Sequence, residues 1–297
     1  MAWRTVYLEQ QTKLWLSRNN LCFYHDEAEL TIPIEDIDTL VIDNHGTKIT
    51  TNLINSLANQ DVAVIICDQS HLPSTVILPY AKHSRQAKIS SGQLNMRQPI
   101  RKQLWQKNII QKILNQAEVL KKFNLEYSEL IRLSGLVKSG DTSNCEALAA
   151  RIYFNQLLGD STRRQPTWYN SALDYGYSIM RSCIARSVVS HGLIASLGIF
   201  HHNELNNFNL VDDLIECYRS FVDFYVLRTV CLRHAGEEFD ENLSKEDRVL
   251  LTQVINENVR IRNLSYSIKH SIDIMVESFI AAFRNEDIGL FELPEFC

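Results

Sequence analysis

The sequence predicts an α+β protein in which a small β-rich N-terminal domain precedes a larger, all-helical C-terminal domain. Short strand-like apolar runs fill the first part of the chain, and from Pro99 onward apolar residues recur at helical spacing. With 10 Gly and 6 Pro in 297 residues, the composition disfavours a turn-rich all-β design. We therefore assign residues 1–82 to the β-rich domain, 83–98 to a polar, basic linker and 99–297 to the helical domain.

The strands of the N-terminal domain are predicted from their apolar patterns. Thr39–Ile42 and Val62–Cys67 are continuous apolar runs, as in strands that are buried on both faces. Residues 50–58 between them have helical spacing, and Asn19–Asn20 is a turn signal. The shorter strand candidates are Trp3–Leu8, Lys13–Leu16, Leu21–Tyr24, Leu30–Ile34 and Ser74–Pro79. We expect a curled sheet or sandwich with one helix.

The helical domain is predicted from apolar residues that recur every three or four positions. Its expected helices cover residues 103–123, 126–136, 144–158, 172–200, 210–232 and 249–283. The region is of a size that one hydrophobic core can support.

Composition places the chain among soluble proteins of a reducing compartment. It is 45% hydrophobic and 22% charged, and its seven cysteines contain no C-x-x-C pair, which argues against a structural zinc or iron–sulfur site. The N-terminus lacks the features of a signal peptide, and the longest apolar run is too short to span a bilayer. We expect a cytoplasmic protein with no membrane partner.

Charge is distributed unevenly along the chain. The formal net charge of −5 means that any DNA contact needs a local basic surface. Acidic residues concentrate in 236–246 and 286–295. Basic residues instead gather in the first half of the helical part and just before it: Lys82, Arg85, Lys88, Arg97, Arg101, Lys102, Lys107, Lys112, Arg151, Arg163, Arg164, Arg181 and Arg186. Solvated helix faces explain most such charges, but the clustering also permits a basic groove.

The densest group of chemistry-bearing residues lies in residues 198–219. His201 and His202 stand in an Asn-rich segment, and Asp213 and Glu216 follow where helical spacing resumes. Residues three apart on a helix share a face, so the two carboxylates and a histidine can hold a hard divalent cation. The alternative is an ordinary helix start with solvated acids.

A third acid, far upstream of these two, is predicted to point toward the interior. Glu146 falls in the first turn of an Ala-rich helix that begins after Ser143 and Asn144. An acid there can also serve only as a helix-dipole partner, worth about 0.3–1 kcal/mol. Glu146, one histidine and Glu216, with or without Asp213, form an O, N, O donor set that suits Mg²⁺ or Mn²⁺ better than structural Zn²⁺.

Three stretches together resemble a known signature. They are S-N-C-E-A-L-A-A-R-I-Y-F at 143–154, N-S-A-L-D-Y-G-Y at 170–177 and the segment G-I-F-H-H-N-E-L-N-N-F-N-L-V-D-D-L-I-E-C-Y-R at 198–219. In type, order and spacing they resemble the CRISPR-associated spacer-acquisition integrase and endonuclease family, the first CRISPR-associated protein, in its type II-like form. Cys217 departs from the pattern, since a proline is common there.

The resemblance implies the site residues. Glu146, His201 and Glu216 match the family's catalytic metal ligands, and Asp213 matches a position that often carries a further acid near the metal. The sequence alone does not separate His201 from its neighbour His202. The implied cofactor is Mg²⁺ or Mn²⁺, with no organic cofactor. Arg219 stands where it can hold the Glu216 carboxylate or reach a phosphate, and the further candidate DNA contacts are Arg85, Arg101, Arg151 and Tyr177.

The resemblance also implies the activity and the partners. The helical domain would be the catalytic part of a metal-dependent DNA integrase and endonuclease of CRISPR adaptation, an antiviral defence, which joins the 3′-OH ends of foreign DNA fragments to the CRISPR repeat array by transesterification. Residues 1–82 would pair two copies into a homodimer. Double-stranded DNA and the small second CRISPR-associated protein would be partners, and the sequence leaves open whether the type II effector nuclease joins them. The alternatives are a non-catalytic DNA-binding scaffold of the adaptation complex and a general metal-dependent nuclease.

Overall fold

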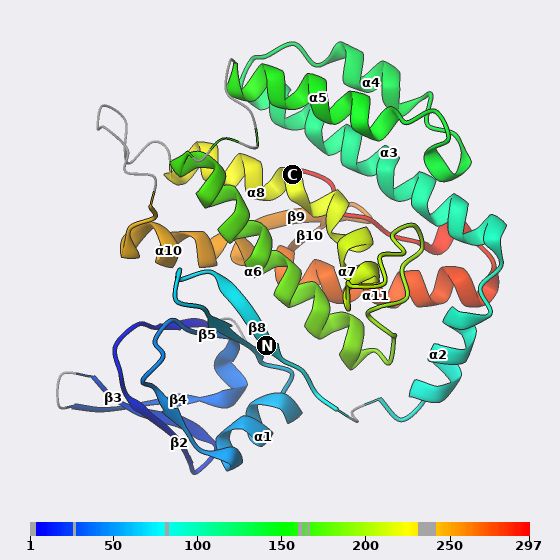
Figure 1. The fold of residues 1–297 in the computed structure, drawn as a ribbon. Helices are drawn as coiled ribbons and strands as arrows, with labels where there is room; N and C mark the ends of the chain where they lie inside the picture. The colour runs from blue at the N-terminus through cyan, green and yellow to red at the C-terminus, as the bar shows by residue number, and fades with distance from the viewer. Residues whose placement is uncertain are drawn as a thin grey trace. The chain divides into compact units, whose positions relative to one another are not determined.

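The computed structural model describes residues 4–25, 28–80, 83–159, 163, 165, 167–230 and 242–297 (Figure 1). The chain forms two compact units, Met1–Ser84 and Arg85–Cys297, which are described separately. Strands dominate the first unit and helices the second, which confirms the predicted α+β class. None of the described helices is both long enough and apolar enough to span a bilayer.

Two four-stranded sheets build the first unit. In one, three parallel strands are joined by an antiparallel fourth, in the order β1 (Arg4–Leu8), β5 (Ile37–Ile42), β7 (Ala63–Cys67) and β8 (Pro73–Ile77). The other has the order β4 (Ala28–Pro33), β3 (Asn20–His25), β2 (Lys13–Ser17) and β6 (Lys48–Ile49). Helix α1 (Thr51–Asn59) connects β6 to β7, and the 3-10 turn η1 (Ile34–Asp36) precedes β5.

Apolar side chains from both sheets and from α1 form one core. Leu14 of β2, Leu40 of β5 and Leu53 of α1 are fully buried in it. The hairpin between β2 and β3 turns at Arg18 and Asn19, whose φ angles of 48° and 63° indicate a type I′ turn. The turn therefore lies one residue earlier than the predicted Asn19–Asn20.

The second unit is built around helix α3 (Gln98–Lys122), which begins with a proline in its first turn. Figure 1 shows α3 beside α4 (Ser128–Ser134) and α5 (Cys145–Leu158), and it also contacts α8 (Arg219–Tyr225). The remaining elements are α2 (Gln86–Leu94), η2 (Ser139–Asp141), α6 (Trp168–Ser190), α7 (Asn209–Leu214), η3 (Ile215–Tyr218), η4 (Val226–Val230), α10 (Lys245–Thr252), η5 (Gln253–Asn256), β9 (Asn258–Ile261), β10 (Leu264–Ser267), α11 (Ile268–Asn285) and η6 (Ile288–Leu290).

The second unit differs from the sequence prediction first at α2 and at the hairpin β9–β10. Helix α2 lies within the range expected to be a linker, because the Gln93 side chain bonds the backbone of Ile194 and Leu197 and fixes the polar segment. The hairpin β9–β10 interrupts a domain predicted to be all-helical. It turns at Arg262 and Asn263, both with positive φ, which lack the usual Asn-Gly signature.

The expected helix over 210–232 is also divided. The chain passes from α7 through the 3-10 turn η3 into α8 and then into the π-helical turn η4. Residues 231–232 lie outside the described range. The tighter turn η3 carries Glu216, and α3 contacts both η3 and α8.

Candidate active site

Glu146 is placed by the start of α5. The Asp141 carboxylate accepts hydrogen bonds from the backbone N–H groups of Cys145 and Glu146, at 2.9 and 3.0 Å, and thus caps the helix. Asn144, which directly precedes the helix, makes no capping side-chain bond. Because α3 contacts both α5 and η3, Glu146 and Glu216 approach each other across α3 although they lie far apart in the sequence.

Lys112 of α3 joins the two carboxylates. Its Nζ lies 2.5 Å from Oε1 of Glu146 and 2.5 Å from Oε2 of Glu216. The lysine is 5% exposed. The sequence marked Lys112 only as one member of a basic cluster, yet two of the predicted metal ligands converge on its ammonium group.

Glu216 is held in its ionised form. Its Oε1 accepts a hydrogen bond of 2.8 Å from Nε of Arg219, which is one of the two roles predicted for that arginine. Burial alone would raise the pKa of Glu216, but the positive charges of Lys112 and Arg219 outweigh it and lower the pKa to about 2. For Lys112, burial lowers the pKa, while Glu216 and Glu146 outweigh it and raise the pKa above its ordinary value.

Asp213 orients His201. The carboxylate is fully buried and accepts four hydrogen bonds, from the backbone N–H groups of Ile199, Phe200 and His201 and from Nδ1 of His201, the last at 2.6 Å. The hydrogen bond to Asp213 raises the pKa of His201 against the effect of burial, and nearby Glu216 raises it further. With Nδ1–H donating to Asp213, the lone pair of Nε2 is left for a ligand.

Close contacts fix the loop that carries His201. A Cβ on Gly198 would lie 2.3 Å from the His201 carbonyl oxygen and 2.7 Å from Oδ2 of Asp213, so only glycine fits. The Arg101 guanidinium donates to the carbonyls of Gly198, Met96 and Gln93. Arg101, a candidate DNA contact, thus supports this loop. His202 is exposed.

A buried network lies behind Glu216. Tyr177 and Tyr153 both donate their hydroxyls to the Asp223 carboxylate. The Arg219 guanidinium lies over the Tyr177 ring, 4.9 Å from its centroid. Burial raises the pKa of Asp223 to about 6, although the two hydroxyls and the guanidinium groups of Arg163 and Arg219 act to lower it.

The network contains one residue that was predicted to contact DNA, Tyr177, and one that was not predicted, Asp223. Tyr177, a candidate DNA contact, lies in the interior and supports Arg219. Asp223 was missed, although an acid within the apolar run F-V-D-F of a helix is a recognisable signal of a buried carboxylate.

Two of the candidate DNA contacts lie at the surface. Arg151 is exposed on α5, the helix that begins with Glu146, and Arg85 is exposed just before α2. Lys82 and Arg164 lie outside the described residues.

The two carboxylates and one imidazole nitrogen of Glu146, Glu216 and His201 are donors of the type that a hard divalent cation accepts. Glu146 and Glu216 already share one positive charge, and His201 has its coordinating nitrogen selected by Asp213. Within the part of the chain that the structure describes, no three His, Cys, Asp or Glu side chains converge into a finished metal site. The Lys112 ammonium occupies the position between the carboxylates of Glu146 and Glu216. The hydrogen bonds of Asp213 indicate that this residue orients His201.

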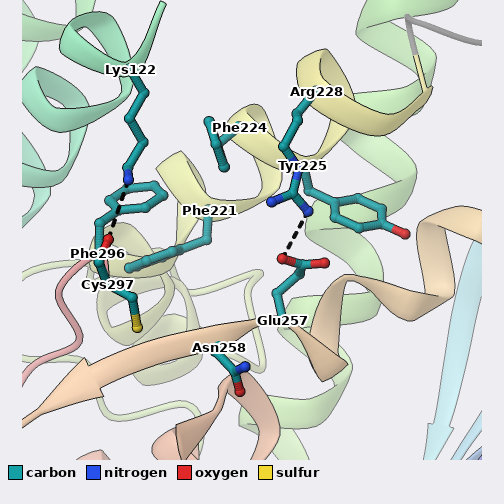
Figure 2. A pocket seen from close by; sticks show the side chains of 9 residues that line it. All are labelled: Lys122, Phe221, Phe224, Tyr225, Arg228, Glu257, Asn258, Phe296 and Cys297. Carbon is teal, nitrogen blue, oxygen red and sulfur yellow. Dashed lines mark hydrogen bonds and ion pairs between the residues drawn. The ribbon is translucent and has the colours of Figure 1, made fainter. Parts of the chain in front are cut away.

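A separate pocket of about 270 Å³ lies near the C-terminal end of α3 (Figure 2). None of Glu146, His201 or Glu216 lines it. Figure 2 shows Arg228 paired with Glu257 and Lys122 donating to the Cys297 carbonyl. The two hydrogen bonds measure 2.9 and 3.3 Å, respectively. The lining residues are Lys122, Phe221, Phe224, Tyr225, Arg228, Glu257, Asn258, Phe296 and Cys297.

Comparison with known proteins identifies the family. Residues 6–260 match the family described as CRISPR associated protein Cas1. A protein named CRISPR-associated endonuclease Cas1, from Neisseria meningitidis serogroup C (strain 8013), is 37% identical over 298 residues, which cover 99% of this chain and 97% of that protein.

Solved structures show the same fold. A casposase bound to its integration product superimposes with a TM-score of 0.75 at 17% identity, over 96% of this chain and 91% of that chain. A chain of a Cas6-RT-Cas1–Cas2 complex gives a TM-score of 0.72 at 19% identity, over 98% of this chain and 36% of that chain. The resemblance seen in the sequence is confirmed, and the chain belongs to the Cas1 family of CRISPR-associated proteins.

Proposed function

We propose that this chain is a metal-dependent DNA integrase and endonuclease of CRISPR adaptation, which joins the 3′-OH ends of foreign DNA fragments to the CRISPR repeat array by transesterification. The observation that carries the proposal is the convergence of Glu146 and Glu216 on one cation, together with the hydrogen bond from His201 to the buried Asp213 carboxylate, which orients the histidine ring. The name of the Neisseria relative supports the endonuclease activity, and the fold shared with a casposase bound to an integration product is consistent with DNA joining.

The proposed chemistry assigns a task to each side chain. Glu146, Glu216 and Nε2 of His201 would hold Mg²⁺ or Mn²⁺, which when bound supplies Lewis-acid polarisation of the scissile phosphate. Asp213 keeps the ring of His201 oriented, and Arg219 keeps Glu216 ionised and in place.

The proposed partners are DNA, a second copy of the chain and the small second CRISPR-associated protein. Cas1 occurs together with Cas2 in the complex with which this chain shares its fold. Exposed Arg151 and Arg85 are the candidate contacts to the DNA backbone, which suits incoming fragments of varied sequence. Pairing through the N-terminal unit and contact with the type II effector nuclease follow from the family resemblance alone.

A joining assay tests the proposal. The protein and its small partner are incubated with short duplex DNA and a repeat-bearing plasmid in Mg²⁺ or Mn²⁺. We expect metal-dependent strand joining that is lost in Glu146→Ala, while binding of the duplex persists. Absence of joining by the unmutated protein with every divalent metal would leave the non-catalytic scaffold, and strong cleavage without joining would favour a general nuclease.

The two adjacent histidines provide an internal control. Because the Asp213 hydrogen bond orients His201, and His202 is exposed, His201→Ala should abolish joining and His202→Ala should retain most of it. The reverse result would place the ligand at His202.

A further inference from the structure

We propose that Lys112 is an internal cation that holds Glu146 and Glu216 together in the metal-free protein and competes with the divalent cation for them. The inference rests on the proposed function, since it treats these two carboxylates as metal ligands. It assigns a positioning role to Lys112 on α3, which lies outside the three motif segments 143–154, 170–177 and 198–219.

The burial of Lys112 indicates that its contacts with the two carboxylates are a built feature of the site. Lysine is almost never fully buried unless it is paired, and Lys112 is 5% exposed. Among the described residues, its ammonium has Glu146 and Glu216 as its polar partners, at 2.5 Å each. Two carboxylates so close to one point repel each other unless a positive charge lies between them. Lys112 therefore supplies the charge that a metal ion would otherwise provide.

The backbone at Lys112 is fixed against the segment that carries Glu216. Asn108, one turn before it on α3, donates to the Asp213 carbonyl at 2.7 Å. Asn115, about one turn after it, donates to the carbonyls of Cys217 and Pro294 at 3.0 and 2.9 Å. These hydrogen bonds fix the backbone of α3 on both sides of Lys112. The lysine can therefore make room for another cation only by moving its side chain, not its backbone.

Charge balance explains the competition. Glu146 and Glu216 together carry two negative charges, and the ammonium of Lys112 and the guanidinium of Arg219 already balance them. A divalent cation between the same carboxylates would leave an excess of two positive charges unless Lys112 moves away. The lysine therefore lowers the affinity for the metal while it preserves the geometry of the site.

The test compares Lys112→Met with the matched control Lys107→Met. Lys107 lies on the same helix, but its ammonium donates to the carbonyls of Ile288 and Gly289. For each purified full-length protein, the melting temperature is measured in EDTA, and Mn²⁺ binding is measured by calorimetry in the absence of DNA.

We expect Lys112→Met to melt at a lower temperature without metal, because the two carboxylates lose their shared cation. It should bind Mn²⁺ about tenfold or more tightly, since a neighbouring unit charge changes the affinity of a carboxylate for a cation by that order. Its gain in melting temperature on adding Mn²⁺ should exceed that of the unmutated protein. Lys107→Met should leave the Mn²⁺ affinity unchanged.

Lys112→Gln gives the same comparison if the methionine variant does not fold, because the amide can still hydrogen-bond a carboxylate. Equal or weaker Mn²⁺ binding by the Lys112 variants would overturn the inference. If Glu216→Gln abolishes Mn²⁺ binding while the Lys112 variants bind as the unmutated protein does, only the role of Lys112 fails. If the unmutated protein and all variants bind no Mn²⁺, both the inference and the metal site of the proposed function fail.

Discussion

Asp213→Asn tests whether a buried carboxylate builds the loop that carries His201. In the structure, Oδ2 accepts the N–H groups of Ile199 and Phe200, and Oδ1 accepts the N–H and the Nδ1–H of His201. An asparagine has only one acceptor oxygen, so its NH₂ group must face one of these pairs of donors. Two donors then lose their acceptor, and only the Ile199 N–H among the four is in a fully buried bond.

The magnitude follows from those two donors. A fully buried donor left without a partner costs about 1–3 kcal/mol and a partly buried donor costs less, so the free energy of unfolding should fall by about 1–4 kcal/mol. That is a large part of the roughly 5–15 kcal/mol by which proteins are stable. Because the Asp213 hydrogen bond is the main cause of the raised pKa of His201, this pKa should also fall toward its ordinary value.

Urea unfolding in EDTA measures the stability, and NMR titration measures the pKa of His201. The matched control is Asp212→Asn, since Asp212 is partly exposed and pairs with Arg181. Loss of that pair should cost only about 1 kcal/mol or less. The reasoning is refuted if Asp213→Asn is no more destabilising than Asp212→Asn and the pKa of His201 does not change.

Three further predictions follow from the same site. Gly198→Ala should lower the free energy of unfolding, measured by urea unfolding, by about 1–3 kcal/mol, because the new Cβ would overlap the His201 carbonyl. The control is Gly135→Ala, where the atom nearest to the new Cβ would be 3.6 Å away. The raised pKa of Asp223, about 6, means that the folded state binds the proton more tightly than the unfolded state does. The free energy of unfolding should therefore fall by about 3 kcal/mol as the pH rises from about 4 to 6. Asp223→Asn should remove this part of the pH dependence of the unfolding free energy. An unchanged pH dependence in the variant would contradict the raised pKa of Asp223. Arg151→Ala should weaken duplex binding in a filter-binding titration, lower the salt dependence of the binding constant by about one phosphate contact and leave the melting temperature unchanged. An unaltered affinity would exclude a phosphate contact by Arg151.

Much of the architecture could be predicted because the signals were local. Continuous apolar runs located β5 and β7, and helical spacing located α3 and α5. The hairpin β9–β10 escaped prediction because Arg262 and Asn263 adopt a turn that sequence usually marks with glycine. Helix α2 escaped because distant backbone groups satisfy Gln93 and thereby order a polar segment.

The site could be predicted only in part, since motifs record the ligands and not what surrounds them. Glu146 and Glu216 meet, and both lie against α3. The partner that joins them, Lys112, reads as a solvated basic residue because its two contacts lie 34 and 104 positions away in the sequence. Arg101 and Tyr177 were candidate DNA contacts for the same reason, and their contacts in the structure are internal.

The most direct test is a crystal structure of the protein soaked with Mn²⁺, with anomalous data collected near the manganese edge. We predict one strong anomalous peak between the carboxylates of Glu146 and Glu216, within bonding distance of Nε2 of His201, with the Lys112 ammonium displaced from its present position. A peak at other residues, or the absence of any peak beside Glu146 and Glu216 at saturating Mn²⁺, would contradict the account.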